Sequence, residues 1–393
     1  MTPLEQFDFP ALRHALADLG ADGWLLYDFR GVNPVTPQVL GIHGMATRRL
    51  FVLLPRDGQP VAIVHKIELG PLAGFPGEVR AYASWRELHA ALRAAVAGRT
   101  VAMEVSTNDN VPYLDRVPHG VVQLIESCGA RIVSSGPLVS RFAARWSDAE
   151  LAGHRRAAEA LAVTAQETIR WAGSEFAGGR VVRETDLQGR VMAAFDREGL
   201  FTDHPPIAAF QPNAANPHYE PVAGQDRTLQ AGDVILLDLW AGPARGSVFA
   251  DQTWMGFAGR SPDAEVRRVW DAVRGARDAA VERLRARWGH TPAVTGAELD
   301  DAAREVIGHA GYADQFVHRT GHSIDRELHG SGPHLDNFET ADDRALVVGV
   351  GFSVEPGIYL TGHFGMRSEI NVFLGERGPE VTPRAPQREL LLV

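Results

Sequence analysis

The chain has 393 residues, of which 45% are hydrophobic and 22% are charged, a composition typical of a folded globular protein rather than a disordered or fibrous one. Its net charge of −10 disfavours nucleic acid and anionic membranes as main partners, because both repel an acidic surface. The single cysteine excludes an internal disulfide and a cysteine-rich zinc site. Only one lysine, Lys66, is present, which leaves little room for a phosphate-binding loop or a Schiff-base mechanism.

The first 20 residues predict a short helix rather than an export signal. Leu12, Leu16 and Leu19 recur on one helical face. A signal peptide would need a basic start followed by an unbroken apolar stretch, which this segment lacks. No part of the sequence comes near the ~18 consecutive apolar residues of a membrane span. The sequence therefore predicts a cytoplasmic protein that does not associate with a membrane.

Residues 21 to 140 alternate short apolar runs with helical stretches, which is typical of an α/β unit. Residues 85–98 predict a helix that ends at a glycine. The segment 31–46 is rich in glycine and proline and predicts a loop, which is either a plain surface connection or one that reaches a binding cleft. Strands are predicted over residues 23–29, 48–55, 60–65, 100–105 and 130–135.

After residue 145 the chain predicts two helices followed by three strands. Ser147 and Glu150 have the spacing of a capping box, which predicts the start of the first helix. The second helix is expected to begin at Thr185, paired with Gln188, and to end at Gly199. The strands are predicted over residues 207–211, 233–240 and 248–257.

The same order then starts again. A long helix carries apolar residues from Val266 to Leu284, and Thr295 with Glu298 caps a second helix that stops at Gly311. Strands are predicted over residues 315–321, 349–360 and 366–374. The segments 147–257 and 264–375 therefore indicate a structural pseudo-repeat.

This order predicts two domains. We expect an α/β N-terminal domain over residues 1–145 and an α+β C-terminal domain over residues 146–393 with internal pseudo-two-fold symmetry. The two halves of the C-terminal domain would place their strands at a shared interface, which is a usual location for a functional site.

Two acidic pairs lie in strand-like runs of the two halves, with nearly equal spacing inside each pair. Asp238 and Asp251 form the first pair, Glu355 and Glu369 form the second, and His322 lies between them. A carboxylate inside a buried strand is unfavourable unless its charge is compensated. Each acid taken singly could be a paired or solvent-facing strand residue. The whole set instead indicates two divalent cations, which can activate a water molecule for hydrolysis.

The chain resembles the pita-bread metallopeptidases, which include methionine aminopeptidase, aminopeptidase P and prolidase. The resemblance is carried by the segments NPHYEP, GDVILLDLW, ADQTW, HRTGHSID, GFSVEPGIY and GMRSEINV. It implies that Asp238, Asp251, His322, Glu355 and Glu369 hold the two ions, with Asp251 and Glu369 bridging both. Glu355 would also accept the proton of the attacking water and donate it to the leaving amine. Oxygen-rich ligands with one nitrogen favour Mn²⁺, while Co²⁺ or Zn²⁺ could also bind.

Four further positions match the proline-specific branch of this family: His218, His318, His329 and Arg367. The resemblance implies that imidazoles bind the scissile carbonyl or its oxyanion and that Arg367 holds the free carboxylate of proline. Alternatives stay open, because Arg367 could pair with a ligand carboxylate and each histidine could be a core residue. Thr253 could support the acidic ligands or simply pack.

The sequence departs from the family pattern on loops of the expected substrate pocket. The family often has a glycine at the position of Asp325 and an acidic residue at the position of Gly330, and residues 211–219 lack the usual glycine. These departures bear on substrate specificity and leave the expected ligands in place.

The resemblance is closest to Xaa-Pro dipeptidase and implies hydrolysis of Xaa-Pro dipeptides, with a small proline-containing peptide as substrate. It also implies a homodimer, in which the 31–46 segment would cover the cleft of the partner. An Xaa-Pro aminopeptidase acting on longer peptides is the first alternative. A creatinase-like hydrolase without metal and a non-enzymatic binding module of the same fold are less favoured, because neither needs all five ligand positions.

Overall fold

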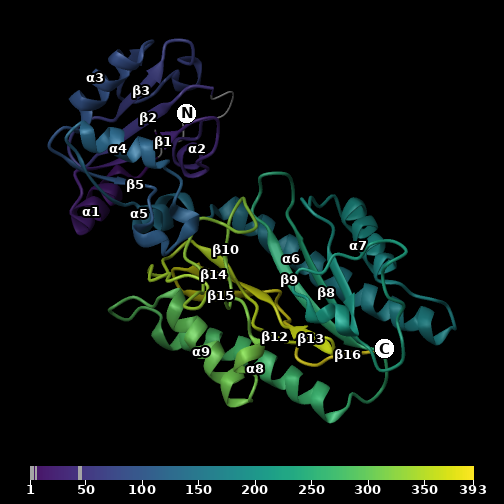
Figure 1. Cartoon of the computed structure of the whole chain (residues 1–393). Coiled ribbons are helices and arrows are strands. Elements are labelled where there is room, and N and C mark those ends of the chain that lie inside the picture. The colour runs from purple at the N-terminus through teal and green to yellow at the C-terminus, as the bar shows by residue number, and fades with distance from the viewer. Residues whose placement is uncertain (1–3, 5–6, 43–46) are drawn as a thin grey trace. The chain divides into compact units, whose positions relative to one another are not determined.

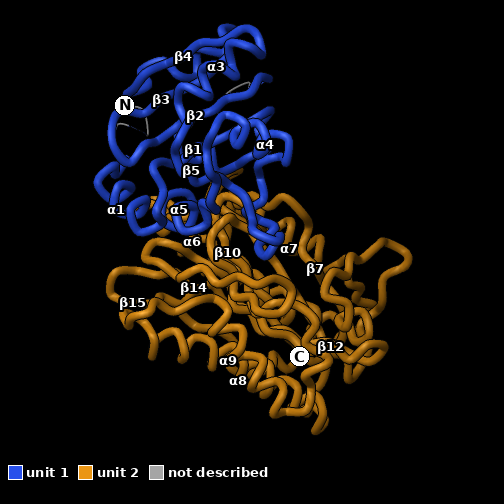
Figure 2. Tube along the Cα trace, turned by 60° about the vertical axis from the view of Figure 1, so that its left-hand side comes forward, with its two compact units in different colours: residues 1–143 blue, residues 144–393 orange. Residues whose placement is uncertain are grey.

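The computed structural model of the protein describes residues 4, 7–42 and 47–393. The chain forms two compact units, Met1–Ala143 and Ala144–Val393 (Figure 2); the sequence places its domain boundary after residue 145. No helix in the described part of the chain is both long enough and apolar enough to cross a lipid bilayer.

Unit 1 is built on a six-stranded sheet with the strand order β4-β3-β2-β1-β5-β6. β1, β2 and β3 pair antiparallel to one another, while β4, β5 and β6 join parallel to their neighbours. The strands are β1 (Gly23–Asp28), β2 (Leu50–Pro55), β3 (Val61–His65), β4 (Glu78–Tyr82), β5 (Thr100–Met103) and β6 (Arg131–Ser134).

Both faces of this sheet are covered, as its nearly continuous apolar strands require. Alternation along β1 buries Trp24 and Leu26 in one core and Leu25 and Tyr27 in the other. The helices that contribute to the first core are α1 (Phe9–Leu19), α2 (Val35–Leu40) and α5 (Gly136–Leu138), and those that contribute to the second are α3 (Trp85–Val96) and α4 (His119–Ser127).

The prediction that residues 31–46 form a loop is wrong for part of the segment. Its middle forms α2, which ends at Gly41 in the left-handed conformation. The helix buries Val35, Thr36, Val39 and Leu40, so packing outweighs the helix-breaking character of the prolines. Residues 43–46 of the same segment lie outside the described residues.

Unit 2 contains one order of elements twice, which confirms the predicted α+β fold with its internal repeat. The first half has α6 (Asp148–Ala177), α7 (Glu184–Glu198), β7 (Ile207–Phe210), β8 (Val234–Ala241) and β9 (Ala250–Phe257). The second half has α8 (Ala264–Arg287), α9 (Gly296–His309), β10 (Ser323–Ile324), β11 (Gly351–Val354), β12 (Gly357–Leu360), β13 (Phe364–Arg367), β14 (Ile370–Gly375) and β15 (Gly378–Thr382). β16 (Leu391–Leu392) then pairs with β9.

Each half forms its own four-stranded sheet, with the orders β16-β9-β8-β7 and β10-β11-β14-β15. β12 and β13 form a separate hairpin. Figure 1 shows α6 and α7 beside β8 and β9, and α8 and α9 beside the strands of the second half. Ile169 of α6 packs with Leu237 of β8 in one core, and Trp270 of α8 packs with Phe352 of β11 in the other.

Local signals set the starts of two of these helices as predicted. Ser147 and Glu150 exchange hydrogen bonds in a complete capping box at the start of α6, and Thr295 and Glu298 do the same at the start of α9. The predicted start of α7 is wrong, because the helix begins at Glu184. The Thr185 hydroxyl binds Asp226 at 2.7 Å instead of capping the helix.

Two predicted strands are interrupted. Residues 349–360 divide into β11 and β12 around Glu355, and residues 366–374 divide into β13 and β14 around Glu369. Pro356 has no N–H to continue a ladder of hydrogen bonds, and the Glu355 N–H donates to the Thr320 carbonyl at 2.7 Å. Both glutamates therefore lie where the chain leaves one sheet for another, rather than in mid-strand.

The strand predicted over residues 315–321 is also absent. The Arg304 guanidinium donates to the carbonyls of Phe316 and His318, and the Thr320 N–H donates to Asp300 Oδ1 at 3.0 Å. Side chains of α9 therefore satisfy backbone groups that a neighbouring strand would otherwise bind.

Candidate metal centre

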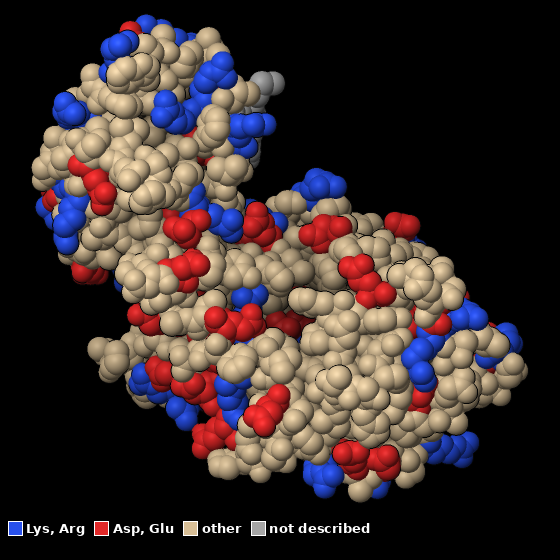
Figure 3. Space-filling view, viewed as in Figure 1, with Lys and Arg blue, Asp and Glu red and all other residues tan. Residues whose placement is uncertain are grey.

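The structure brings the two predicted acidic pairs together in unit 2. Asp238 lies in β8 and Asp251 in β9, and the antiparallel register sets Asp238 opposite Thr253. Glu355 and Glu369 lie at the two strand interruptions of the second half. Figure 3 shows acidic side chains within a hollow of unit 2, on the face turned to the viewer.

Hydrogen bonds between the two halves fix this convergence. The Asn371 side chain of β14 brackets the backbone of Asp251, accepting from its N–H at 2.9 Å and donating to its carbonyl at 2.8 Å. The Thr253 hydroxyl donates to Glu369 Oε2 at 2.8 Å. Thr253 thus supports an acidic residue, which is the first of the two roles that the sequence left open.

Three donor groups lie close enough to hold one cation. A carboxylate oxygen of Asp251, one of Glu369 and a ring nitrogen of His322 all lie within 4.8 Å of one another, and all three residues are buried. The His322 Nε2 lies 3.3 Å from Asp251 Oδ2 and 3.3 Å from Glu355 Oε1. Its Nδ1 lies 3.1 Å from the Ser323 carbonyl, which favours the tautomer that leaves Nε2 with a free lone pair for a metal.

Three oxygens of the carboxylates are free to bind a cation. Asp238 Oδ1, Asp251 Oδ1 and Glu369 Oε1 are buried and have no hydrogen-bond partner within the described ranges. Leaving a buried acceptor unpaired costs about 1–3 kcal/mol, and more for a charged group. Buried, unpaired oxygens beside an imidazole are the donor set of a divalent metal site. The residues present therefore fit the metal ions that the sequence predicts.

Burial and mutual repulsion shift the pKa values of this cluster. Burial, together with the charges of Asp251 and Glu355, raises the pKa of Asp238 to about 7. Burial and the neighbouring acids also raise the pKa of Asp251 and lift the pKa of Glu369 well above its ordinary value. Burial alone would raise the pKa of Glu355, but the positive charges nearby outweigh it and lower this pKa to about 2.

Metal binding is expected to release protons and to tighten as the pH rises between about 5.5 and 7.5. The reason is that the raised pKa values keep protons on the carboxyl groups of Asp238 and Glu369, and a cation must displace them. Titration calorimetry with Mn²⁺ in two buffers of different ionisation enthalpy measures this release. An affinity independent of pH over that range would contradict the expectation.

The metal-free protein is expected to show the opposite trend in stability. The Asp238 carboxyl loses its proton near its ordinary pKa of 3.8 when the chain is unfolded but near about 7 when it is folded. The folded state therefore binds more protons between these values, so the free energy of unfolding falls as the pH rises through that window. Thermal unfolding with a chelator measures this fall, and excess Mn²⁺ should remove it.

Arg367 pairs with a predicted ligand. It is buried, its Nη2 forms an ion pair with Asp238 Oδ2, and its Nε lies 2.8 Å from the Thr253 hydroxyl and 3.9 Å from Glu369 Oε2. Its Nη1 donates to the Tyr359 hydroxyl at 3.3 Å. The structure thus contains the pairing that the sequence left open as an alternative to a substrate clamp.

The three predicted substrate histidines have different surroundings. His218 and His329 are exposed, and the His329 ring lies 4.4 Å from the His322 ring. His318 is half-buried, and burial lowers its pKa to about 4, so it is neutral at neutral pH. Its Nδ1 lies 2.7 Å from the Arg319 carbonyl and its Nε2 lies 2.8 Å from the Tyr359 hydroxyl. Both ring nitrogens of His318 are therefore engaged within the protein.

Sequence reasoning missed the residues that support this centre. Tyr359 links His318 to Arg367, and burial raises its pKa to about 12. The Ser353 hydroxyl accepts from the His322 N–H and donates to Glu355 Oε1, both at 2.9 Å. The spacing of Tyr359 four residues after Glu355 is a weak signal; Ser353 resembles any strand residue and carries no signal.

A buried carboxylate organises the segment that carries His218. Glu184 is fully buried at the start of α7. It accepts hydrogen bonds from the Phe210 N–H at 2.6 Å, the Tyr219 hydroxyl at 2.7 Å and the Arg227 N–H at 2.8 Å. These bonds hold both ends and the middle of residues 210–227 against one side chain.

Comparison with known proteins matches this architecture. Residues 152–376 match the family model described as metallopeptidase family M24. A protein of Mycobacterium tuberculosis named "Probable dipeptidase PepE" is 28% identical over 362 residues, 90% of this chain and 88% of that protein. The Xaa-Pro dipeptidase of Lactobacillus helveticus is 34% identical over 157 residues, 40% of this chain and 38% of that protein. The crystal structure of dipeptidase PepE from Mycobacterium ulcerans has a TM-score of 0.74 and 25% identity, covering 98% of this chain and 99% of that chain.

Proposed function

The chain belongs to metallopeptidase family M24, and on this premise we propose that it hydrolyses Xaa-Pro dipeptides with two divalent metal ions bound per chain. The observation that carries the proposal is the group of three buried carboxylate oxygens, on Asp238, Asp251 and Glu369, that lack hydrogen-bond partners within the described residues. The names of the mycobacterial and lactobacillar relatives, both dipeptidases, support a short substrate.

We propose five ligands for the two ions: Asp238, Asp251, His322, Glu355 and Glu369. Their oxygen-rich composition favours Mn²⁺. When bound, such ions polarise the scissile carbonyl and make a water molecule more acidic. Glu355 Oε1, held by Ser353 at 2.9 Å, would accept the proton from the attacking water and pass it to the departing proline nitrogen.

The exposed histidines are the proposed contacts for the substrate. His218 and His329 can donate to the scissile carbonyl and stabilise the charge that develops on its oxygen. His318 has both ring nitrogens occupied, so we assign it a positioning role through Tyr359. We assign Arg367 a positioning role as well, because its guanidinium binds Asp238, Thr253 and Tyr359. Both assignments differ from the substrate contacts that the resemblance implies, which stay the alternative for each residue.

Turnover of Ala-Pro and Ala-Pro-Ala by the Mn²⁺-loaded protein tests this function. We expect faster hydrolysis of the dipeptide and loss of both activities with a chelator. Preference for the tripeptide would indicate an Xaa-Pro aminopeptidase, and full activity with the chelator would contradict the metal dependence. If neither peptide is cleaved and no metal binds, the creatinase-like hydrolase and the non-enzymatic module become the favoured alternatives. The homodimer, the cytoplasmic location and the covering role of residues 31–46 stay predictions.

A further inference from the structure

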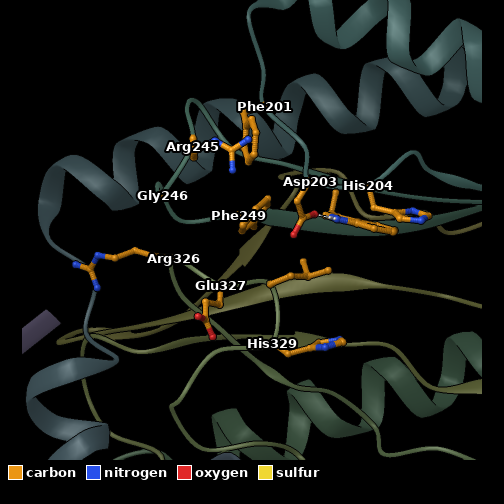
Figure 4. A pocket seen from close by; sticks show the side chains of 11 residues that line it. Phe201, Asp203, His204, Arg245, Gly246, Phe249, Arg326, Glu327 and His329 are labelled. Atoms are coloured by element: carbon orange, nitrogen blue, oxygen red, sulfur yellow. Dashed lines mark hydrogen bonds between the residues drawn. The ribbon is translucent and has the colours of Figure 1, made fainter. Parts of the chain in front are cut away.

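A cavity of about 590 Å³ lies in unit 2 beside the proposed metal centre, within the usual size range of small-molecule sites. Figure 4 shows Phe201, Arg245 and Phe249 on one side of it and Glu327 and His329 on the other. Trp240 and Leu328 also line it.

Two residues of the cavity lining are neighbours of proposed metal ligands. His329 lines the cavity, and its ring lies 4.4 Å from the ring of His322. Trp240 lies directly opposite Asp251 in the β8–β9 ladder. If the scissile bond of a peptide lies at the carboxylate cluster, the side chain of the adjacent substrate residue can therefore reach this cavity.

Aromatic rings form much of the cavity lining. The rings of Phe201 and Phe249 lie 6.4 Å apart at 46°, within the range of favourable aromatic pairs. The Trp240 Nε1 donates to Asp203 Oδ1 at 2.8 Å, and the indole stacks on His204 at 6.0 Å and 14°. The one polar atom of the indole is thus already hydrogen-bonded to another residue of the lining.

Several charged groups at the cavity wall already have partners. The Arg326 guanidinium lies 2.7 Å from Glu150, and Arg245 lies 4.6 Å above the Phe201 ring. Asp203 accepts the hydrogen bond of the indole. The lining therefore favours an apolar occupant over a charged side chain that would have to compete for these partners.

Two of the departures from the family pattern, Asp325 and Gly330, shape one wall of this cavity. Asp325 is buried and accepts hydrogen bonds from the Glu327 N–H at 2.8 Å and the Ser331 N–H at 3.0 Å. A Cβ added to Gly330 would come within 2.8 Å of the Asp325 carboxylate. Gly330 thus leaves the space that the Asp325 carboxylate occupies. The hydrogen bonds of Asp325 in turn hold the turn that contains Leu328 and His329.

We propose that this cavity receives the side chain of the residue before the scissile bond and selects aromatic and large aliphatic side chains over small or charged ones. The inference rests on the proposed dipeptidase function. It identifies Phe201, Trp240, Phe249 and Leu328 as specificity-determining residues, and Asp325 as the residue that positions the wall containing Leu328.

Hydrolysis of Phe-Pro, Leu-Pro, Ala-Pro, Asp-Pro and Lys-Pro by the Mn²⁺-loaded protein tests the proposal. We expect kcat/KM for Phe-Pro to exceed that for Ala-Pro by roughly 10-fold or more, with the two charged dipeptides below Ala-Pro. Equal values for Phe-Pro and Ala-Pro, or a preference for a charged residue, would overturn the specificity while leaving the proposed function intact. Cleavage of none of the five would instead contradict the proposed function.

Two variants locate the preference. Phe201→Ala and Leu328→Ala should each lower the Phe-Pro to Ala-Pro ratio of kcat/KM by at least about threefold. Val163→Ala, at an exposed position of α6, is the control and should keep the wild-type ratio. Thermal unfolding checks that each variant is folded, and Leu328→Ala keeps the test decisive if Phe201→Ala is not. An unchanged ratio in a folded variant of either residue would contradict its assignment.

Discussion

Replacing Glu369 with glutamine is expected to abolish metal-dependent hydrolysis, with kcat/KM falling by more than about 100-fold, beyond the effect of losing a residue that only supports a metal ligand. Glu369 contributes one oxygen to the three-residue group; its Oε2 accepts from the Thr253 hydroxyl, and its Oε1 has no hydrogen-bond partner among the described residues. An amide binds a divalent ion more weakly than a carboxylate because it carries no charge. Kinetics on Ala-Pro over a range of Mn²⁺ concentrations measures the loss.

The same variant should not destabilise the metal-free protein. Burial and three neighbouring acids raise the pKa of Glu369 well above its ordinary value, so its ionised form is unfavourable in the folded state at neutral pH. Glutamine removes that repulsion and keeps the shape. We expect an unchanged or higher Tm with chelator, and a loss of the increase in Tm that Mn²⁺ gives the wild-type protein.

Glu376→Gln is the matched control, because Glu376 is exposed in the turn between β14 and β15. It should keep both the activity and the response to Mn²⁺. Wild-type turnover in Glu369→Gln, or an undiminished increase in its Tm with Mn²⁺, would show that Glu369 is not a ligand.

Replacing Arg367 with alanine is expected to lower kcat and metal affinity by roughly 10- to 100-fold, as for other residues that hold metal ligands in place. The guanidinium binds Asp238 and approaches Glu369, so its loss leaves buried acids without a positive neighbour. Breaking such a buried pair costs about 3–5 kcal/mol, and a lower Tm should accompany the kinetic change.

The separate effects of Arg367→Ala on kcat and on KM distinguish the two possible roles of this side chain. If the side chain positions ligands, kcat falls and added Mn²⁺ partly restores it. If it holds the carboxylate of proline instead, KM rises while kcat and metal affinity stay the same. Arg377→Ala, at an exposed position of the turn before β15, provides the control for removal of an arginine.

Local signals made much of the fold predictable. The capping boxes of Ser147 with Glu150 and Thr295 with Glu298 depend on residues three positions apart, so their geometry follows from the sequence alone. Alternation along β9 likewise places Asp251 and Thr253 on one face, whereas the register that sets Asp238 opposite Thr253 depends on the partner strand.

Contacts between residues distant in the sequence explain two wrong predictions. Residues 315–321 include Phe316 and Val317, residue types common in strands, but α9 binds the backbone of this segment through Arg304 and Asp300. α2 forms inside a segment predicted as a loop because its apolar residues pack in a hydrophobic core. In both places a partner distant in the sequence decided the local structure.

The sequence by itself determined which residues were able to form the metal centre, because their type and spacing are properties of the chain. Only the tertiary structure decided what surrounds them: Asn371 joins the two halves at Asp251, and Arg367 faces the carboxylates with its guanidinium. The physical reason is that a hydrogen bond forms between groups that are neighbours in space. These neighbours come from separate sheets, and the local sequence pattern does not predict which of them will be in contact.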